Sequence, residues 1–110
     1  MANLAPKLLY IGNDTAANVY SVANTSGNYT IIKSINICNT SNVANATASV
    51  HILSNGDAPS SNNKIISNAN VIKDDVLYYN TSIVVPENSN VYVASSANTL
   101  TFTISGVEYA

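Results

Sequence analysis

Charge is scarce in this sequence. Its 110 residues include four lysines, no arginine, six acidic residues and one histidine, so that 9% are charged, whereas an average soluble domain has about 25%. The four lysines are scattered along the chain, and phosphate binding requires clustered basic residues. Nucleic acid is therefore not an expected partner.

Sulfur is scarce as well. The single cysteine, Cys38, excludes an internal disulfide and every zinc site that needs two thiolates. We expect it to be a small buried residue near the end of a strand. The alternative is an interchain disulfide or a reactive thiol, although no basic residue lies beside it in the sequence to activate it.

Long hydrophobic runs are also absent. No apolar segment reaches the roughly 18 residues that span a bilayer, so a membrane is not an expected partner. The first fifteen residues, MANLAPKLLYIGNDT, lack a basic stretch followed by about 7–15 apolar residues. We therefore expect no signal peptide.

Groups for acid–base or metal chemistry are few. His51 is the only histidine, and the alternation of its strand places it on an outer face or at an interface. The sequence contains no nucleophile elbow. Asp74 and Asp75 are adjacent, so they would point to opposite sides of a strand. Asp14 and Asp57 lie in Asn-rich turns, whereas a calcium loop concentrates several carboxylates. We predict no enzymatic activity, no metal and no cofactor.

Apolar and neutral polar residues dominate what is present. Asparagine, serine and threonine make 41 residues, and leucine, isoleucine, valine and phenylalanine make 29. That apolar share exceeds the roughly 20% below which disorder is expected. The length allows one domain with a real core, so we predict a single domain over 1–110.

The hydrophobic periodicity is two, which is typical of half-buried strands. Within 99–105, for example, Leu100, Phe102 and Ile104 alternate with hydroxyl residues. The eight predicted strands are 7–11, 16–22, 29–38, 46–53, 63–67, 76–85, 90–95 and 98–109. This all-β pattern predicts a single antiparallel β-sandwich, of either the jelly-roll or the immunoglobulin-like type, with 1–27 as an N-terminal arm or as edge strands.

Two strands allow sharper predictions. In 76–85 the alternation turns Leu77, Tyr79 and Ile83 inward and leaves Tyr78 outward. Gly106 interrupts the last strand and predicts a bulge there. The longest surface loop is expected at 54–63, where turn-forming residues are densest.

Seven tyrosines provide the best candidates for an interface, because each joins a large apolar ring to a polar tip. The alternative is that they lie at the sheet rim with their hydroxyls in water. An uncharged threonine-rich face would repel a neighbour little and lacks the charges that usually protect strand edges. We also expect the chain ends, 2–11 and 107–110, to add to neighbouring subunits. The predicted interface residues are Tyr78, Tyr92, Thr99, Thr101, Thr103, Leu8, Tyr10 and Tyr109.

Several strand segments follow one another in an order that is similar to the order of strands in a known group of proteins. They are YTIIKSINICNT at 29–40, SVHI at 49–52, YNTSIVVP at 79–86, NVYVAS at 90–95 and LTFTISGVE at 100–108. Over roughly 28–109 this strand pattern resembles the small β-sandwich virion proteins of tailed bacteriophages. The likeness carries over no catalytic residue.

The resemblance implies a non-enzymatic, multi-copy structural protein of the virion, assembled in the host cytoplasm. It favours a capsid decoration (cement) protein that binds the major capsid protein and stabilises the head, as a homo-oligomer and preferentially a trimer. A tail, head-fibre or baseplate component is the alternative. A carbohydrate-binding β-sandwich module is a further alternative, which the absence of tryptophan and the dispersed tyrosines make weaker.

Overall fold

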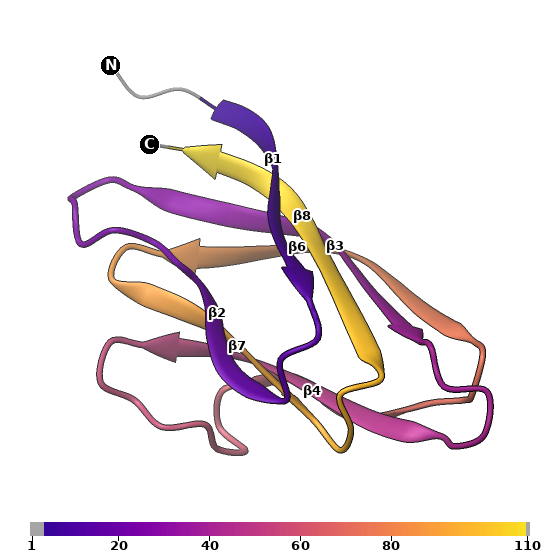
Figure 1. Cartoon of the computed structure of the whole chain (residues 1–110). Helices are drawn as coiled ribbons and strands as arrows, with labels where there is room; N and C mark the ends of the chain where they lie inside the picture. Colours follow the sequence, from indigo (N-terminus) through magenta and orange to yellow (C-terminus); the bar gives the residue numbers. More distant parts are fainter. Residues whose placement is uncertain (1–3, 110) are drawn as a thin grey trace.

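The computed structural model describes residues 4–109, and all its regular elements are strands (Figure 1). They are β1 (Leu4–Gly12), β2 (Ala16–Ser21), β3 (Tyr29–Asn39), β4 (Ala46–Ser54), β5 (Lys64–Val71), β6 (Val76–Pro86), β7 (Ser89–Ser95) and β8 (Leu100–Tyr109). The eight-strand, all-β prediction is confirmed. β1 begins earlier than expected, and β5 continues to residue 71 instead of ending at 67. Residues 4–109 contain no helix that is long and apolar enough to cross a membrane.

The strands form two four-stranded antiparallel sheets. Sheet A has the order β1-β8-β3-β6, and sheet B has the order β2-β7-β4-β5. The first four strands pair with the last four in reverse: β1 with β8, β2 with β7, β3 with β6, and β4 with β5. This winding is that of a jelly roll. It decides between the two sandwich types that the sequence left open, and it makes β1 and β2 edge strands.

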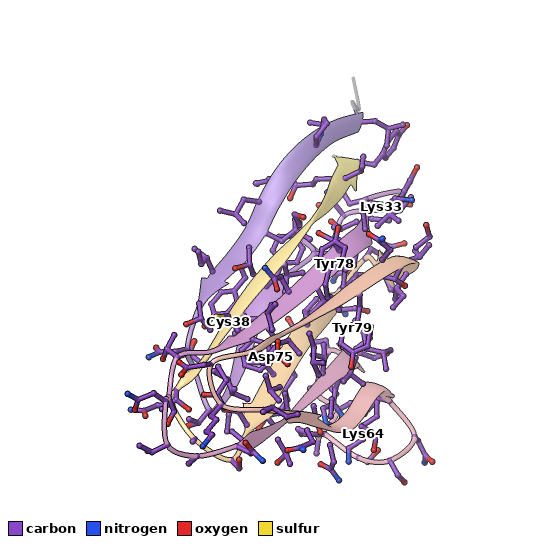
Figure 2. All side chains as sticks on the ribbon, turned by 90° about the vertical axis from the view of Figure 1, so that its right-hand side faces the viewer. Lys33, Cys38, Lys64, Asp75, Tyr78 and Tyr79 are labelled. Atoms are coloured by element: carbon purple, nitrogen blue, oxygen red, sulfur yellow. The ribbon has the colours of Figure 1, made fainter. Side chains whose placement is uncertain are left out.

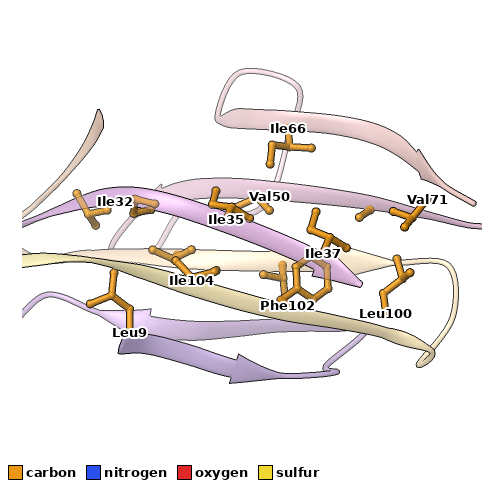
Figure 3. Packing of buried hydrophobic residues seen from close by; sticks show 14 of the residues in the cluster. Leu9, Ile32, Ile35, Ile37, Val50, Ile66, Val71, Leu100, Phe102 and Ile104 are labelled. Atoms are coloured by element: carbon orange, nitrogen blue, oxygen red, sulfur yellow. The ribbon is translucent and has the colours of Figure 1, made fainter. Parts of the chain in front are cut away.

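The core lies between the two sheets (Figure 3). Leu100, Phe102 and Ile104 of β8 all point into it and have no exposed surface, as their alternation with hydroxyl residues predicts. Burying a side chain of this size stabilises a fold by roughly 1.5–3 kcal/mol. From sheet B, Val50, Val91 and Val93 meet them, along with other members of the same buried cluster.

The middle of β8 lies between two irregular neighbours. The register of β3 against β8 shifts between Ile32 and Ser34, and that of β1 shifts between Leu8 and Tyr10. Gly106 is buried at this point, and a Cβ there would overlap the carbonyl oxygen of Ile31. The bulge expected at Gly106 is therefore carried by the strands on either side, while β8 itself alternates regularly.

Candidate interaction surface

Large exposed apolar side chains gather on one side of the molecule, the outer face of sheet A. Strand β1 contributes Leu4, Leu8 and Ile11, and β6 contributes Val76, Tyr78 and Val84, each with 46–61% of its surface exposed. The other two strongly exposed large hydrophobic residues within 4–109 lie in connections, at positions 43 and 72. The face is thus bordered by two apolar rows, one along each edge strand.

Neutral polar side chains lie between the two rows. Thr101, Thr103 and Ser105 of β8 point to this face because Leu100, Phe102 and Ile104 point inward. Ser105 Oγ lies 2.5 Å from Ser34 Oγ on β3. Nearer the chain ends, the rings of Tyr29 and Tyr109 stack with centroids 4.9 Å apart. These side chains of β8 and of the tyrosine pair are therefore uncharged.

One buried acceptor in this centre lacks a hydrogen-bond donor among the described residues. The side-chain oxygen of Asn36 is buried and accepts no hydrogen bond from residues 4–109. Asn36 stands in register with Tyr78 on β6 and with Thr103 on β8. An unpaired buried acceptor costs roughly 1–3 kcal/mol.

Among residues 4–109, the outer face of sheet A carries one charged side chain, that of Lys33 on the central strand β3. Its ammonium group donates a 2.6 Å hydrogen bond to Ser82 Oγ on β6 (Figure 2). Lys7 and Glu108 turn toward the end of the sandwich instead, where they form an ion pair with 3.1 Å between Nζ and Oε1. The surface therefore offers little for a strongly charged partner to recognise.

The outer face of sheet B is different, because the β4–β5 connection covers part of it. His51 and Leu53 belong to this face but are only 3% and 2% exposed. Asn63 holds the connection down: its main-chain oxygen accepts from Ile52 N at 3.0 Å, and its Oδ1 lies 2.6 Å from His51 Nδ1. His51 therefore lies on the outer face of its sheet, as the alternation predicts, but it is buried beneath the connection and anchors it.

The same carboxamide closes the connection itself. Asn63 Oδ1 accepts from Ser60 N and its Nδ2 donates to Ala58 O, both at 3.0 Å. Because that oxygen can only accept, Nδ1 of His51 carries the proton in their pair. Tyr92 of β7 packs edge-on against the imidazole, with ring centroids 5.6 Å apart. These contacts give His51 a structural part.

A polar cluster connects the two sheets at the end of the sandwich where β1 begins and β8 ends. Tyr20 of β2 donates a short hydrogen bond to Glu108 Oε2, and its hydroxyl lies 2.8 Å from Thr30 Oγ1. Burial and the bond to Glu108 raise the pKa of Tyr20 to about 12. The hydrogen bonds from Tyr20 and then Lys7 lower the pKa of Glu108. Tyr20 thus keeps its proton and Glu108 its charge, which suits a latch between sheets and not proton exchange.

The structure brings together five of the eight predicted interface residues. Leu8, Tyr78, Thr101, Thr103 and Tyr109 all lie on the outer face of sheet A. Four further residues on this face were not predicted. Alternation places Leu4 with Leu8, and Val76 and Val84 with Tyr78, on this side. Ile11 reaches the same side only because β1 shifts register between Leu8 and Tyr10.

The other three lie elsewhere. Tyr92 is on sheet B. Tyr10 packs against the core and donates to Asp14 Oδ2 at 2.9 Å. Thr99 is in the turn before β8, where its carbonyl accepts from Thr40 N.

Other predicted features also have defined places. Cys38 is half-buried on β3, in register with Val76, and not buried in the core as expected. Asp74 lies in the β5–β6 turn with φ 56°, and Asp75 Oδ1 accepts from Val76 N at 2.8 Å. Of the chain ends expected to join neighbours, 4–11 lie in the edge strand β1, whereas 107–109 lie in β8, which is already paired with β1 and β3 on its two sides. Residues 2, 3 and 110 lie outside the described residues.

Within residues 4–109 no three histidine, cysteine or acidic side chains come close enough to hold a metal ion. Comparisons of the chain with protein-family models, with curated proteins and with solved structures found no match. The outer face of sheet A therefore stands as the candidate interaction surface on its geometry and composition.

Proposed function

We propose that this chain is a non-enzymatic structural protein of a bacteriophage virion, present in many copies, that docks on other virion subunits through the outer face of sheet A. The observation that carries this proposal is the pair of exposed apolar rows on β1 and β6 around a neutral polar centre in which Lys33 is the single charged side chain among the described residues. Within this class we favour capsid decoration, as the resemblance of the strand pattern to small virion proteins implies, with the major capsid protein as the partner and the head as the structure that is stabilised.

The face has the properties of a docking platform. Its side chains stand on a four-stranded sheet, so little conformational entropy is lost when a partner covers it. Completing the burial of six half-exposed apolar side chains contributes on the order of 1 kcal/mol each. That sum offsets part of the cost of association and gives modest affinity for one copy. A capsid lattice repeats the same binding site many times, so many copies of the chain would bind it.

The fold agrees with this use without specifying it. Jelly rolls occur in viral capsid proteins and also in lectins, and a shared architecture does not decide function. A sugar platform needs exposed aromatic rings in a row, but Tyr78 stands alone on β6 and Tyr29 is stacked on Tyr109. Tyr92 is half-buried against His51. Contacts between proteins are therefore the better interpretation.

Co-sedimentation tests the proposal directly. Heads and tails would be purified from the tailed phage that encodes this chain, after its gene has been inactivated so that the particles lack the protein. The purified chain would then be mixed with the emptied heads and, separately, with the tails. We expect saturable binding to heads that changes little with salt, because few charges are involved. Binding to tails alone would place the protein in the tail, and binding to neither would contradict the proposal.

Matched variants locate the surface. Leu8→Ser combined with Ile11→Ser removes two exposed apolar side chains from β1 and should weaken binding at least about tenfold. Tyr92→Ser on sheet B is the control and should bind as the unmodified chain does. Equal binding by all three proteins would show that the outer face of sheet A is not the docking surface.

A further inference from the structure

We propose that β6 pairs with β6 of a second copy of this chain, antiparallel and across a two-fold axis at Asn80, to form a continuous eight-stranded sheet. The proposal goes beyond the virion function and does not depend on it. It starts from the four edge strands of the sandwich, which are β1 and β6 in sheet A and β2 and β5 in sheet B.

All four edge strands shift register against their neighbours, and three of them carry a further feature that hinders pairing with another chain. β1 contains Pro6 and Lys7 and has a register shift. β2 is six residues long and also shifts register. β5 has irregular pairing with β4 and a left-handed residue, Asn68, with φ 48°. Proline, lysine, shortness and bulges are the usual protections of sheet edges.

β6 shifts register against β3 between Asn80 and Ile83, but it has none of the further protections within 76–85. It spans eleven residues with strictly alternating exposure, and its only proline is the last residue, Pro86. No charged residue occurs between Val76 and Val85 (Figure 2, in which Tyr78 and Tyr79 are labelled). A long, uncharged edge with apolar side chains at both ends is a template for another strand.

The direction of the main-chain groups follows from the pairing with β3. Asn39 N donates to Asp75 O at 2.9 Å, so residue 75 turns its polar groups toward β3. In an antiparallel ladder this orientation recurs at every second residue, and the exposure of β6 keeps alternating in the same sense across the register shift between Asn80 and Ile83. The even-numbered residues, from Val76 to Val84, therefore direct their N–H and C=O groups away from sheet A.

The sequence of β6 is complementary to itself about Asn80. With Asn80 opposite Asn80 of the partner, even residues meet even residues, as the free main-chain groups require. The apolar flanks then meet each other and the polar centre meets itself. The cross-strand pairs are Val76 with Val84, Leu77 with Ile83, Tyr78 with Ser82, and Tyr79 with Thr81.

These pairs favour a second copy over an unrelated strand. Five hydrogen-bonded residue pairs would supply about ten main-chain bonds, and a two-fold axis closes the assembly at two copies. Pairing would also join the apolar rows formed by Val76, Tyr78 and Val84 of both copies into one surface. The chain would then dock on partners as a dimer, instead of the trimer that the resemblance implies.

The charges lie only at the ends of the paired strands. Asp74, Asp75 and Lys73 precede β6 and Glu87 follows it, all of them exposed. In the antiparallel pair the acidic groups of one copy approach those of the other, with Lys73 offsetting part of the repulsion. Added salt should therefore leave the dimer intact or strengthen it.

Charge reversal at the axis tests the proposal. Light scattering behind a sizing column should give about twice the protomer mass of 11.6 kDa. Asn80→Lys and Asn80→Glu each place like charges opposite one another, so each should weaken dimerisation at least about tenfold. An equimolar mixture of the two should regain the dimer. Asn70→Lys, at an exposed asparagine of β5, is the control and should remain dimeric.

A cross-link gives a second readout. In a Cys38→Ser background, Asn80→Cys should form an interchain disulfide under mild oxidation, because hydrogen-bonded antiparallel pairs have Cα atoms about 5.5 Å apart. Asn70→Cys should not. A monomer at high protein concentration, a trimer, or mixing that fails to restore the dimer would overturn the proposal. Binding of the Leu8 and Ile11 variant to heads is measured independently, so failure of either proposal can be recognised by itself.

Discussion

Replacing Gly106 by alanine should lower the free energy of unfolding by about 3 kcal/mol. A Cβ at this position would overlap Ile31 O and would come within 3.0 Å of the Ile31 carbonyl carbon and 3.1 Å of Ile32 Cα. All three atoms are main-chain atoms of the central strand β3, so relief requires the strands to separate. Overpacking of this kind costs about 1–3 kcal/mol, and each weakened ladder hydrogen bond adds roughly 1 kcal/mol.

Urea unfolding followed by tyrosine fluorescence measures this cost, since the chain has seven tyrosines and no tryptophan. The midpoint should fall while the slope stays unchanged, because the surface exposed on unfolding is the same. Gly12→Ala is the control: the new Cβ would meet the ring end of Tyr10, a side chain that can rotate away. If Gly106→Ala cost less than about 1 kcal/mol, or no more than Gly12→Ala, the close approach of β3 and β8 would be refuted.

Three further predictions concern the core, the β4–β5 connection and the polar cluster. Phe102→Ala should cost about 3–5 kcal/mol in the same unfolding experiment, because the ring is fully buried; a cost below 2 kcal/mol would contradict its central place. Asn63→Ala should speed proteolytic cleavage within 55–63 while leaving the sheets folded, and unchanged cleavage would show that its carboxamide does not hold the connection. The folded-state pKa of Glu108 lies below the ordinary 4.5, so its carboxylate stabilises the fold above that pH and ceases to do so as the pH falls through the lowered value. Glu108→Gln should therefore flatten the acid side of a stability–pH curve. The pKa of Tyr20 is raised from 10.0 to about 12, so its protonated phenol stabilises the fold below pH 10, and this contribution is lost as the pH rises through 12. An absorbance titration should show that this phenol ionises at a higher pH than an ordinary tyrosine. Glu108→Gln should lower the pH at which it ionises.

Alternation in the sequence was sufficient to place the strands, because a strand between core and solvent must change side at every residue. It correctly turned Leu77, Tyr79 and Ile83 inward and Tyr78 outward. Alternation carries no information on which strands become neighbours. The jelly-roll winding therefore emerged only with the structure, since β1 and β8 come from opposite ends of the chain.

The candidate surface was predicted in part for the same reason. The threonines of β8 and Tyr78 were assigned to an outer face, but the sequence could not show that β1 and β6 border the same sheet as β8. Tyr92 was grouped with them and lies on the other sheet. The burial of His51 depends on how Asn63 folds the β4–β5 connection back, a contact that strand periodicity does not encode.

The reversed pairing of the first four strands with the last four has a kinetic consequence. Only β4 and β5 are both paired and adjacent in the chain, separated by the connection 55–63. Every other pair in the series closes a longer loop, up to β1 with β8, where Leu4 stands opposite Tyr109. Loop-closure entropy rises with that separation, and folds rich in distant contacts fold slowly. We expect the chain to zip outward from the β4–β5 hairpin, so that β1 joins last, and mutations there should speed unfolding with little effect on the rate of folding.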